Sequence, residues 1–243
     1  MPLLSRKRIP VRERLMFALD VDTQRDAMKI VEDLGDSVQF YKVGLQLFMS
    51  DNYFTLIDWL GEKGKKVFAD LKFHDVPETV RAAVRQLSRR KVEFATVHAG
   101  SDAIMRAAVE EKKTMKILAV TALTSLDQND VDDLGFKCSV EELVLSRARR
   151  ALEIGCDGVI SSGIEAPKLK EKFGDRLIIV SPGIRPVENR QVDDQKRTVD
   201  IETAFNNGAD YIVVGRPIRT APDPRARAEE IQTRIAAVFS ESA

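Results

Sequence analysis

The chain has 243 residues, 44% of them hydrophobic and 31% charged, which is enough apolar material for a large core and enough charge for a polar surface. Lysine plus arginine and aspartate plus glutamate both number 38, so no excess charge draws the chain to nucleic acid or to an anionic membrane, and we expect neither partner. No apolar run is long enough for a secretory signal or a membrane span, which predicts a soluble, cytoplasmic protein.

Short apolar runs alternate along the chain with amphipathic stretches, and this alternation predicts eight strand–helix units. The predicted strands are residues 15–20, 38–44, 66–72, 93–100, 115–123, 157–163, 176–183 and 210–217. The predicted helices are residues 23–34, 52–63, 76–90, 101–112, 139–154, 165–173, 201–207 and 224–238.

Continuous Val, Ile, Leu and Phe runs alternating with helices favour buried parallel strands, and eight units in this length favour a (β/α)8 TIM barrel, an α/β fold of one domain. A doubly wound sheet is the alternative, but "LDVDTQ" after the first strand has no glycine-rich turn. We predict a barrel over residues 15–243 behind an N-terminal extension, residues 1–14. The polar connection 184–200 has no helical period and is predicted to be a lid.

Helix ends and cysteines give two smaller predictions. Gly155 and Gly208 each follow a predicted helix, where glycine can adopt the left-handed conformation that ends it. Cys138 and Cys156 are too few and too far apart for disulfide staples or a metal cluster, so we expect two ordinary thiols.

Charged residues close the first three predicted strands, at the end of a barrel where active sites lie. Asp20 ends the first strand, Lys42 precedes the end of the second, and Asp70 and Lys72 end the third. Because side chains alternate along a strand, Asp70 and Lys72 share one face and are predicted to point into the barrel mouth. An inert ion-pair network is the alternative to catalysis.

Other conspicuous side chains favour structural roles. His74 is expected to turn away from the mouth beside Phe73, and His98 to secure a strand end. Trp59 lies on one helix face with Leu56 and is expected to pack in the core.

Several motifs, in order along residues 15–240, resemble orotidine 5'-phosphate decarboxylase of the bacterial type. "DLKFHDVPETV" resembles its Asp-x-Lys-x-x-Asp signature. The other motifs are "LD" at 19–20, "YKVG" at 41–44, "ALTS" at 122–125, "SPGIRP" at 181–186, "DDQKR" at 193–197 and "VVGRPI" at 213–218. Each motif is weak alone, and together they are specific.

The resemblance implies decarboxylation of orotidine 5'-phosphate to uridine 5'-phosphate in de novo pyrimidine synthesis, with no metal and no organic cofactor. Lys72 is implied as the proton donor to pyrimidine C6, in a network with Lys42, Asp70 and Asp75, and Asp75 is implied to reach the partner's site in a homodimer. The implied substrate-binding residues are Asp20, Lys42, Thr79, Thr124, Pro182, Arg185, Gln195, Gly215 and Arg216.

The requirements of this decarboxylation support the same roles independently of the resemblance. Loss of CO2 from an sp2 carbon leaves a carbanion, which needs a fixed positive charge and a proton nearby. Lys72 supplies both. Backbone amides near Gly183 and Gly215 can approach a phosphate, and Arg216 can grip it with two parallel N–H bonds, although glycines there could instead only shape turns.

Two alternatives stay open. A magnesium-dependent phosphate-sugar decarboxylase or synthase of the same suprafamily has an acidic metal ligand at the end of the second strand, where this sequence has Lys42. A nucleotide-binding regulator would keep the phosphate grip without chemistry, and the pair Asp70 and Lys72 argues against it. The sequence departs from the family pattern at "TVD", where Asp200 is able to cap a helix, and at "AGSD" after His98.

Overall fold

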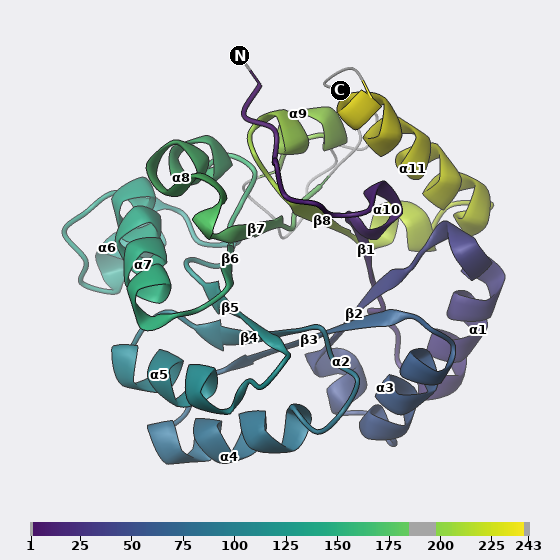
Figure 1. The fold of residues 1–243 in the computed structure, drawn as a ribbon, viewed down its shortest axis with the longest axis horizontal. Coiled ribbons are helices and arrows are strands. Elements are labelled where there is room, and N and C mark those ends of the chain that lie inside the picture. Colours follow the sequence, from purple (N-terminus) through teal and green to yellow (C-terminus); the bar gives the residue numbers. More distant parts are fainter. Residues whose placement is uncertain (1, 185–197, 241–243) are drawn as a thin grey trace.

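Eight parallel strands close into a barrel in the computed structural model, which describes residues 2–184 and 198–240. Each strand pairs with the next, and the first pairs with the last, so the TIM barrel predicted from the sequence is confirmed (Figure 1). The strands are β1 (Leu15–Ala18), β2 (Phe40–Gly44), β3 (Lys66–Phe73), β4 (Phe94–His98), β5 (Lys116–Val120), β6 (Gly158–Ile160), β7 (Ile178–Ser181) and β8 (Tyr211–Val214).

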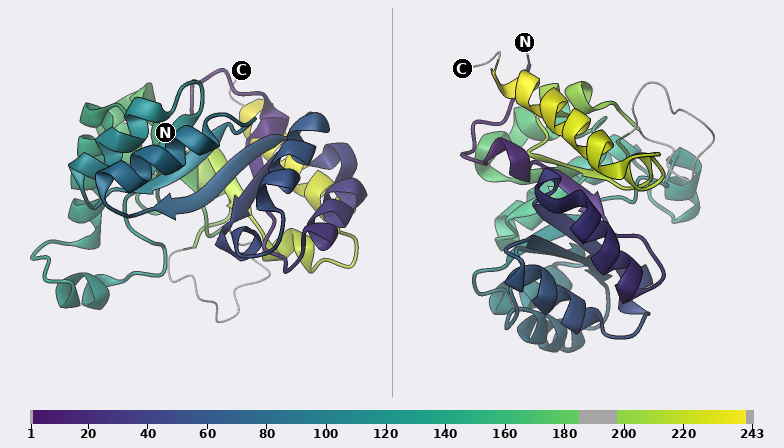
Figure 2. Two further views of the ribbon diagram at one scale, coloured as in Figure 1. Left: turned by 90° about the horizontal axis from the view of Figure 1, so that it is seen from below. Right: turned by 90° about the vertical axis from the view of Figure 1, so that its right-hand side faces the viewer.

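Helices surround the barrel as a ring in Figure 1. They are α1 (Gln24–Leu34), α2 (Leu45–Phe48), α3 (Tyr53–Glu62), α4 (Pro77–Leu87), α5 (Asp102–Glu111), α6 (Gln128–Asp133), α7 (Val140–Ile154), α8 (Ala166–Phe173), α9 (Ile201–Asn206), α10 (Arg216–Arg219) and α11 (Pro224–Ser240). The sequence did not predict α2, α6 and α10, short helices at the connections between the predicted strands and the longer predicted helices. Figure 2 shows α6 standing out from the ring, at the end of the barrel away from the C-terminus.

Several helix ends follow from local chemistry. Ser139 begins α7 with a reciprocal capping box to Glu142, and Asp200 accepts a hydrogen bond of 2.7 Å from the Thr203 N–H, as its position before α9 predicted. Gly155 ends α7 at φ 99° and Gly208 follows α9 at φ 98°, in the left-handed conformation predicted for both.

Alternation along each strand divides the core into two parts. In β1, Leu15 and Phe17 face the helices, whereas Met16 faces the barrel interior. Aromatic rings fill the interior around Phe94, whose ring centroid lies 5.2 Å from that of Phe40 and 5.3 Å from that of Tyr211. The barrel interior at this level is therefore a packed core and not an open pore.

The predicted N-terminal extension is tied to the end of the barrel where the strands begin. Asp210, fully buried before β8, accepts a hydrogen bond from Ser5 and one of 2.8 Å from the Lys7 ammonium. Its Oδ2 atom also accepts one of 2.8 Å from the Ile179 N–H. A buried carboxylate needs such partners, so Asp210 anchors this segment to β7 and β8.

Candidate active site

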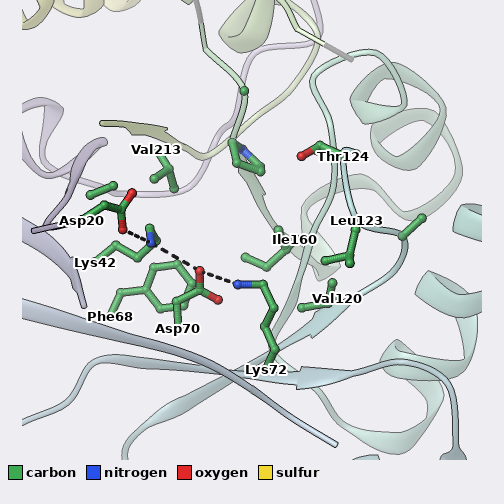
Figure 3. Close-up of a pocket in the computed structure, with 14 residues that line it drawn as sticks. Asp20, Lys42, Phe68, Asp70, Lys72, Val120, Leu123, Thr124, Ile160 and Val213 are labelled. Atoms are coloured by element: carbon green, nitrogen blue, oxygen red, sulfur yellow. Dashed lines mark hydrogen bonds and ion pairs between the residues drawn. The ribbon is translucent and has the colours of Figure 1, made fainter. Parts of the chain in front are cut away.

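A cavity of about 210 Å³ opens where the strands end, and ten of its side chains are labelled in Figure 3. Polar side chains lie on two sides of it, and its inner wall is apolar. The lining residues are Ala18, Asp20, Lys42, Phe68, Asp70, Lys72, Val120, Ala122, Leu123, Thr124, Ile160, Pro182, Gly183 and Val213. They come from several strands and the loops after them, as in a barrel active site.

A row of alternating charges crosses one side of the cavity (Figure 3). The Lys42 ammonium lies 3.1 Å from Oδ1 of Asp20 and 3.6 Å from Oδ2 of Asp70. The Lys72 ammonium lies 2.9 Å from the same Oδ2 of Asp70. Asp70 therefore holds two ammonium groups at the edge of the cavity.

An irregularity in β3 brings Lys72 to the cavity. The register with β4 runs from Ala69 opposite Ala95 to Phe73 opposite Val97, so β3 uses four residue steps where β4 uses two. Lys72 lies inside this bulge at φ 49°, a left-handed conformation that is unfavourable for lysine. Asp70 and Lys72 do meet, as predicted, but by a bulge and not by the simple alternation from which we predicted it.

The electrostatics favour the ionised forms of the two central members of the row, Asp70 and Lys42. Burial alone would raise the pKa of Asp70, but the charges of Lys42 and Lys72 and hydrogen bonds from Lys72 and Thr96 outweigh it, so the pKa lies below its ordinary value. Burial alone would lower the pKa of Lys42, but the carboxylates of Asp70 and Asp20 outweigh it, so that pKa is raised. Both shifts favour the charged forms.

The apolar wall is built from inward positions of the strands. Phe68, Val120, Ile160 and Val213 belong to the cluster of side chains inside the barrel and also line the cavity. Thr124 lies across the cavity from the charged row in Figure 3. The site therefore combines an apolar wall with a charged edge and a hydroxyl opposite, a combination that suits a polar heterocycle.

The structure gathers six of the predicted site residues at this cavity: Asp20, Lys42, Asp70, Lys72, Thr124 and Pro182. Gly215 lies at its rim, because a Cβ atom there would come 3.7 Å from Oδ2 of Asp20. Arg216 begins α10 beside it and is exposed. Arg185 and Gln195, and most of the predicted lid, lie outside the described residues.

Asp75 and Thr79 are placed differently. Both are exposed, and neither lines the cavity of its own chain. Oδ1 of Asp75 accepts a hydrogen bond of 2.6 Å from the N–H of Val76, just before α4. Within one chain the charged row consists of Asp20, Lys42, Asp70 and Lys72. The implied role of Asp75 in the partner's site stays a prediction.

The two histidines form a pair beside the site. The rings of His74 and His98 lie 5.0 Å apart, so His74 packs on His98, a contact that the sequence did not predict. Burial, followed by the charges of His74 and Lys72, lowers the pKa of His98. Neither histidine lines the cavity, which agrees with a structural role.

Sequence reasoning missed Gly44 and Thr96. A Cβ atom on Gly44 would come 3.3 Å from the Lys42 ammonium nitrogen, so the glycine leaves room for that ammonium. The buried Thr96 hydroxyl donates to Asp70 and accepts from the Lys72 backbone. The "YKVG" motif, which includes Gly44, could have identified the glycine as a site residue. Nothing in the local sequence singles out Thr96.

Over residues 2–184 and 198–240, no three side chains of His, Cys, Asp or Glu gather closely enough to hold a metal ion. The carboxylates of Asp20 and Asp70 each contact an ammonium group instead. In the same part of the chain, every helix is too short or too polar to cross a bilayer.

Known proteins resemble the chain over nearly its whole length. The model of the orotidine 5'-phosphate decarboxylase / HUMPS family matches residues 13–231. Proteins named orotidine 5'-phosphate decarboxylase from Methylococcus capsulatus and Nitrobacter winogradskyi are 63% and 48% identical, over 98% and 93% of both chains. The crystal structure of orotidine 5'-phosphate decarboxylase from Lactobacillus acidophilus is 36% identical with a TM-score of 0.81, over 92% of this chain and 99% of that one. This chain therefore belongs to the orotidine 5'-phosphate decarboxylase / HUMPS family.

Proposed function

We propose that this chain decarboxylates orotidine 5'-phosphate to uridine 5'-phosphate in cytoplasmic pyrimidine synthesis. The observation that carries the proposal is the Lys72 ammonium, held 2.9 Å from Asp70 at the edge of an apolar cavity. The names of the relatives that are 63% and 48% identical support the same reaction. Membership of the family alone does not choose between its branches, and the charged row supports the decarboxylation of orotidine 5'-phosphate.

In the proposed mechanism the bond between pyrimidine C6 and its carboxylate carbon breaks and CO2 leaves. The electron pair stays on C6 as a carbanion. The Lys72 ammonium stabilises this charge and then donates a proton, which forms the C6–H bond and leaves lysine as a neutral amine. Asp70 holds the Lys72 ammonium in place at the edge of the cavity, because its Oδ2 atom pairs with that ammonium at 2.9 Å.

Binding is divided around the cavity. Asp20 and Lys42 are proposed to hold ribose hydroxyls, and Thr124 to hydrogen-bond the pyrimidine from the opposite side. Pro182, Gly215 and Arg216 are proposed to hold the phosphate, because they follow β7 and β8, where barrels commonly bind one. The proposed roles of Arg185 and Gln195 in the lid stay predictions from the resemblance.

The charged row also separates this reaction from the magnesium-dependent alternative. Lys42 lies in β2, two residues before its end, and its ammonium group lies between the carboxylates of Asp20 and Asp70. A divalent cation at the same place would be repelled by Lys42 and Lys72. We therefore propose a reaction that needs neither metal nor organic cofactor.

We further propose a homodimer in which Asp75 and Thr79 serve the partner's site. Two features support this. Asp75 lies outside the cavity of its own chain. Large apolar side chains are exposed after β2 and β3: Leu45 is 53%, Met49 80% and Val76 63% exposed. An apolar surface of this kind suits contact with a second copy of the chain.

The absorbance change on loss of orotidine 5'-phosphate tests the reaction, measured with and without EDTA. We expect turnover that EDTA does not change. Activity lost in EDTA and restored by magnesium would assign the chain to the magnesium-dependent alternative. Binding of uridine 5'-phosphate without turnover would make it a nucleotide-binding regulator.

Mixed dimers test the role of Asp75. Lys72→Ala and Asp75→Asn should each be nearly inactive alone, after each is shown to fold and to dimerise. Unfolded together and refolded, about half the dimers are mixed, and each mixed dimer has one complete site of two, so activity should return to roughly a quarter of the unmutated level. Absence of recovery would place Asp75 in the site of its own chain.

A further inference from the structure

The hydroxyl of Thr96 joins two parts of the charged row that come from β3. Thr96 lies in β4, is fully buried and does not line the cavity. Its Oγ1 atom accepts a hydrogen bond of 2.8 Å from the Lys72 backbone N–H. The same oxygen donates one of 3.0 Å to Oδ1 of Asp70. A hydroxyl has one proton and two lone pairs, so it can make both bonds at once.

The bulge in β3 explains why the Lys72 N–H needs this acceptor. Regular pairing of β3 with β4 stops at Ala69 and resumes at Phe73, so Lys72 lies outside the regular ladder. A buried N–H without an acceptor costs free energy, and the φ of 49° at Lys72 is itself unfavourable. The Thr96 hydroxyl supplies the acceptor and so supports the backbone conformation that turns Lys72 toward the cavity.

The second bond determines which oxygen of Asp70 faces the lysines. Oδ1 is occupied by Thr96, while Oδ2 lies 2.9 Å from the Lys72 ammonium and 3.6 Å from that of Lys42. The hydrogen bond from Thr96 also favours the ionised carboxylate and contributes to its lowered pKa. One buried hydroxyl thus bears on both the charge and the orientation of Asp70.

We propose that Thr96 is a positioning residue of the decarboxylation: its hydroxyl holds the Asp70 carboxylate and the Lys72 backbone in the arrangement that aims the Lys72 ammonium at the reacting carbon. This inference rests on the proposed function. Thr96 itself touches neither the cavity nor a ligand within it. It therefore acts on the chemical step and not on nucleotide binding.

Thr96→Val tests this role, because valine keeps the shape and loses the hydroxyl. Hydrogen bonds to charged groups have strengths that correspond to a factor of about 10 to 100, so we expect kcat to fall about tenfold to hundredfold. The Kd for uridine 5'-phosphate, measured by calorimetry, should stay within about twofold, because Thr96 makes no contact with a ligand. The acid limb of kcat/KM should move to higher pH, since Asp70 loses a donor that favours its ionised form.

Two variants serve as controls. Thr96→Ser restores the hydroxyl and should recover most of the lost kcat. Thr121→Val makes the same chemical change at another buried threonine. The Thr121 hydroxyl donates a hydrogen bond of 3.0 Å to the backbone oxygen of Ile160 and contacts no member of the charged row. It should leave kcat near the unmutated value. Thermal unfolding of each variant shows that it is folded.

The outcomes separate this proposal from the proposed function. Unmutated protein that does not turn over orotidine 5'-phosphate refutes the function. With an active unmutated protein, unchanged kcat in Thr96→Val overturns the positioning role. A loss that Thr96→Ser shares overturns it too, because the methyl group and not the hydroxyl would then matter. If Thr96→Val does not fold, Thr96→Ala replaces it, since the smaller side chain gives a water room to rescue the buried N–H, and the same comparison of kcat with Kd decides.

Discussion

Asp70 is the side chain on which the charged row depends, and Asp70→Asn removes its charge without changing its shape. At an effective dielectric constant of 20, unit charges at the observed 2.9 and 3.6 Å attract by roughly 6 and 5 kcal/mol. Desolvation offsets much of this attraction in the folded protein. Removing one partner of a buried pair nevertheless costs about 3–5 kcal/mol, because the remaining charges stay buried. We expect the free energy of unfolding to fall by about that amount near neutral pH.

The pH dependence identifies the cause. Asp70 has a folded pKa below its unfolded value of about 3.9, so its contribution is present above that value and is lost as the pH falls through the folded pKa. The raised pKa of Lys42 has the opposite sign, and its contribution is lost only as the pH rises through the folded value, above about 10.4. The difference between unmutated protein and Asp70→Asn should therefore be constant from about pH 5 to 8 and should shrink below about pH 4.

Urea unfolding at a series of pH values measures this difference, and the assay of orotidine 5'-phosphate loss measures the chemistry. We expect kcat/KM of Asp70→Asn to fall by about a hundredfold or more, because the cation at the reacting carbon loses its fixed counter-charge. Asp33→Asn is a matched control, since Asp33 pairs with Lys29 at 3.4 Å on an exposed helix face and should change neither quantity measurably. Equal stability of Asp70→Asn and unmutated protein at pH 7, or a difference that persists unchanged at the lowest pH of folding, would refute the reasoning.

Three further substitutions test other parts of the structure. Gly44→Ala should lower kcat/KM by about tenfold, because its Cβ would come 3.3 Å from the ammonium nitrogen of Lys42. Gly100→Ala is the control and should not lower it, because a Cβ atom on Gly100 would have no neighbour within 4 Å. Equal effects of the two substitutions in one steady-state assay would contradict this. Asp210→Asn should lower the free energy of unfolding by about 3–5 kcal/mol, because Asp210 is buried and paired with Lys7. Its kcat should stay unchanged, since Asp210 lies at the opposite end of the barrel from the cavity. A large loss of kcat in folded Asp210→Asn would contradict this. Arg216→Ala should lower kcat/KM, and added phosphite should restore part of the activity on a substrate without phosphate; an unchanged kcat/KM would remove Arg216 from the site.

The sequence alone determined the barrel and much of its site. Alternating apolar runs and amphipathic stretches sufficed for eight strand–helix units, because burial of a parallel sheet under helices leaves a pattern in every segment. Strand ends of a barrel meet at one rim, so the sequence predicted correctly that Asp20, Lys42, Asp70 and Lys72 lie together. The helix ends at Gly155 and Gly208 were also correct, because the left-handed conformation is a local property of glycine.

Only the tertiary structure decided how these side chains are held. The bulge that turns Lys72 at φ 49° depends on pairing with β4, so no period within β3 contains it. Thr96 acts on Asp70 across 26 positions of sequence. The contact between the rings of His74 and His98 was not predicted, for the same reason. Local sequence records which face of an element is buried, but hydrogen bonds between elements depend on register and close approach, which the chain fixes only when the barrel closes.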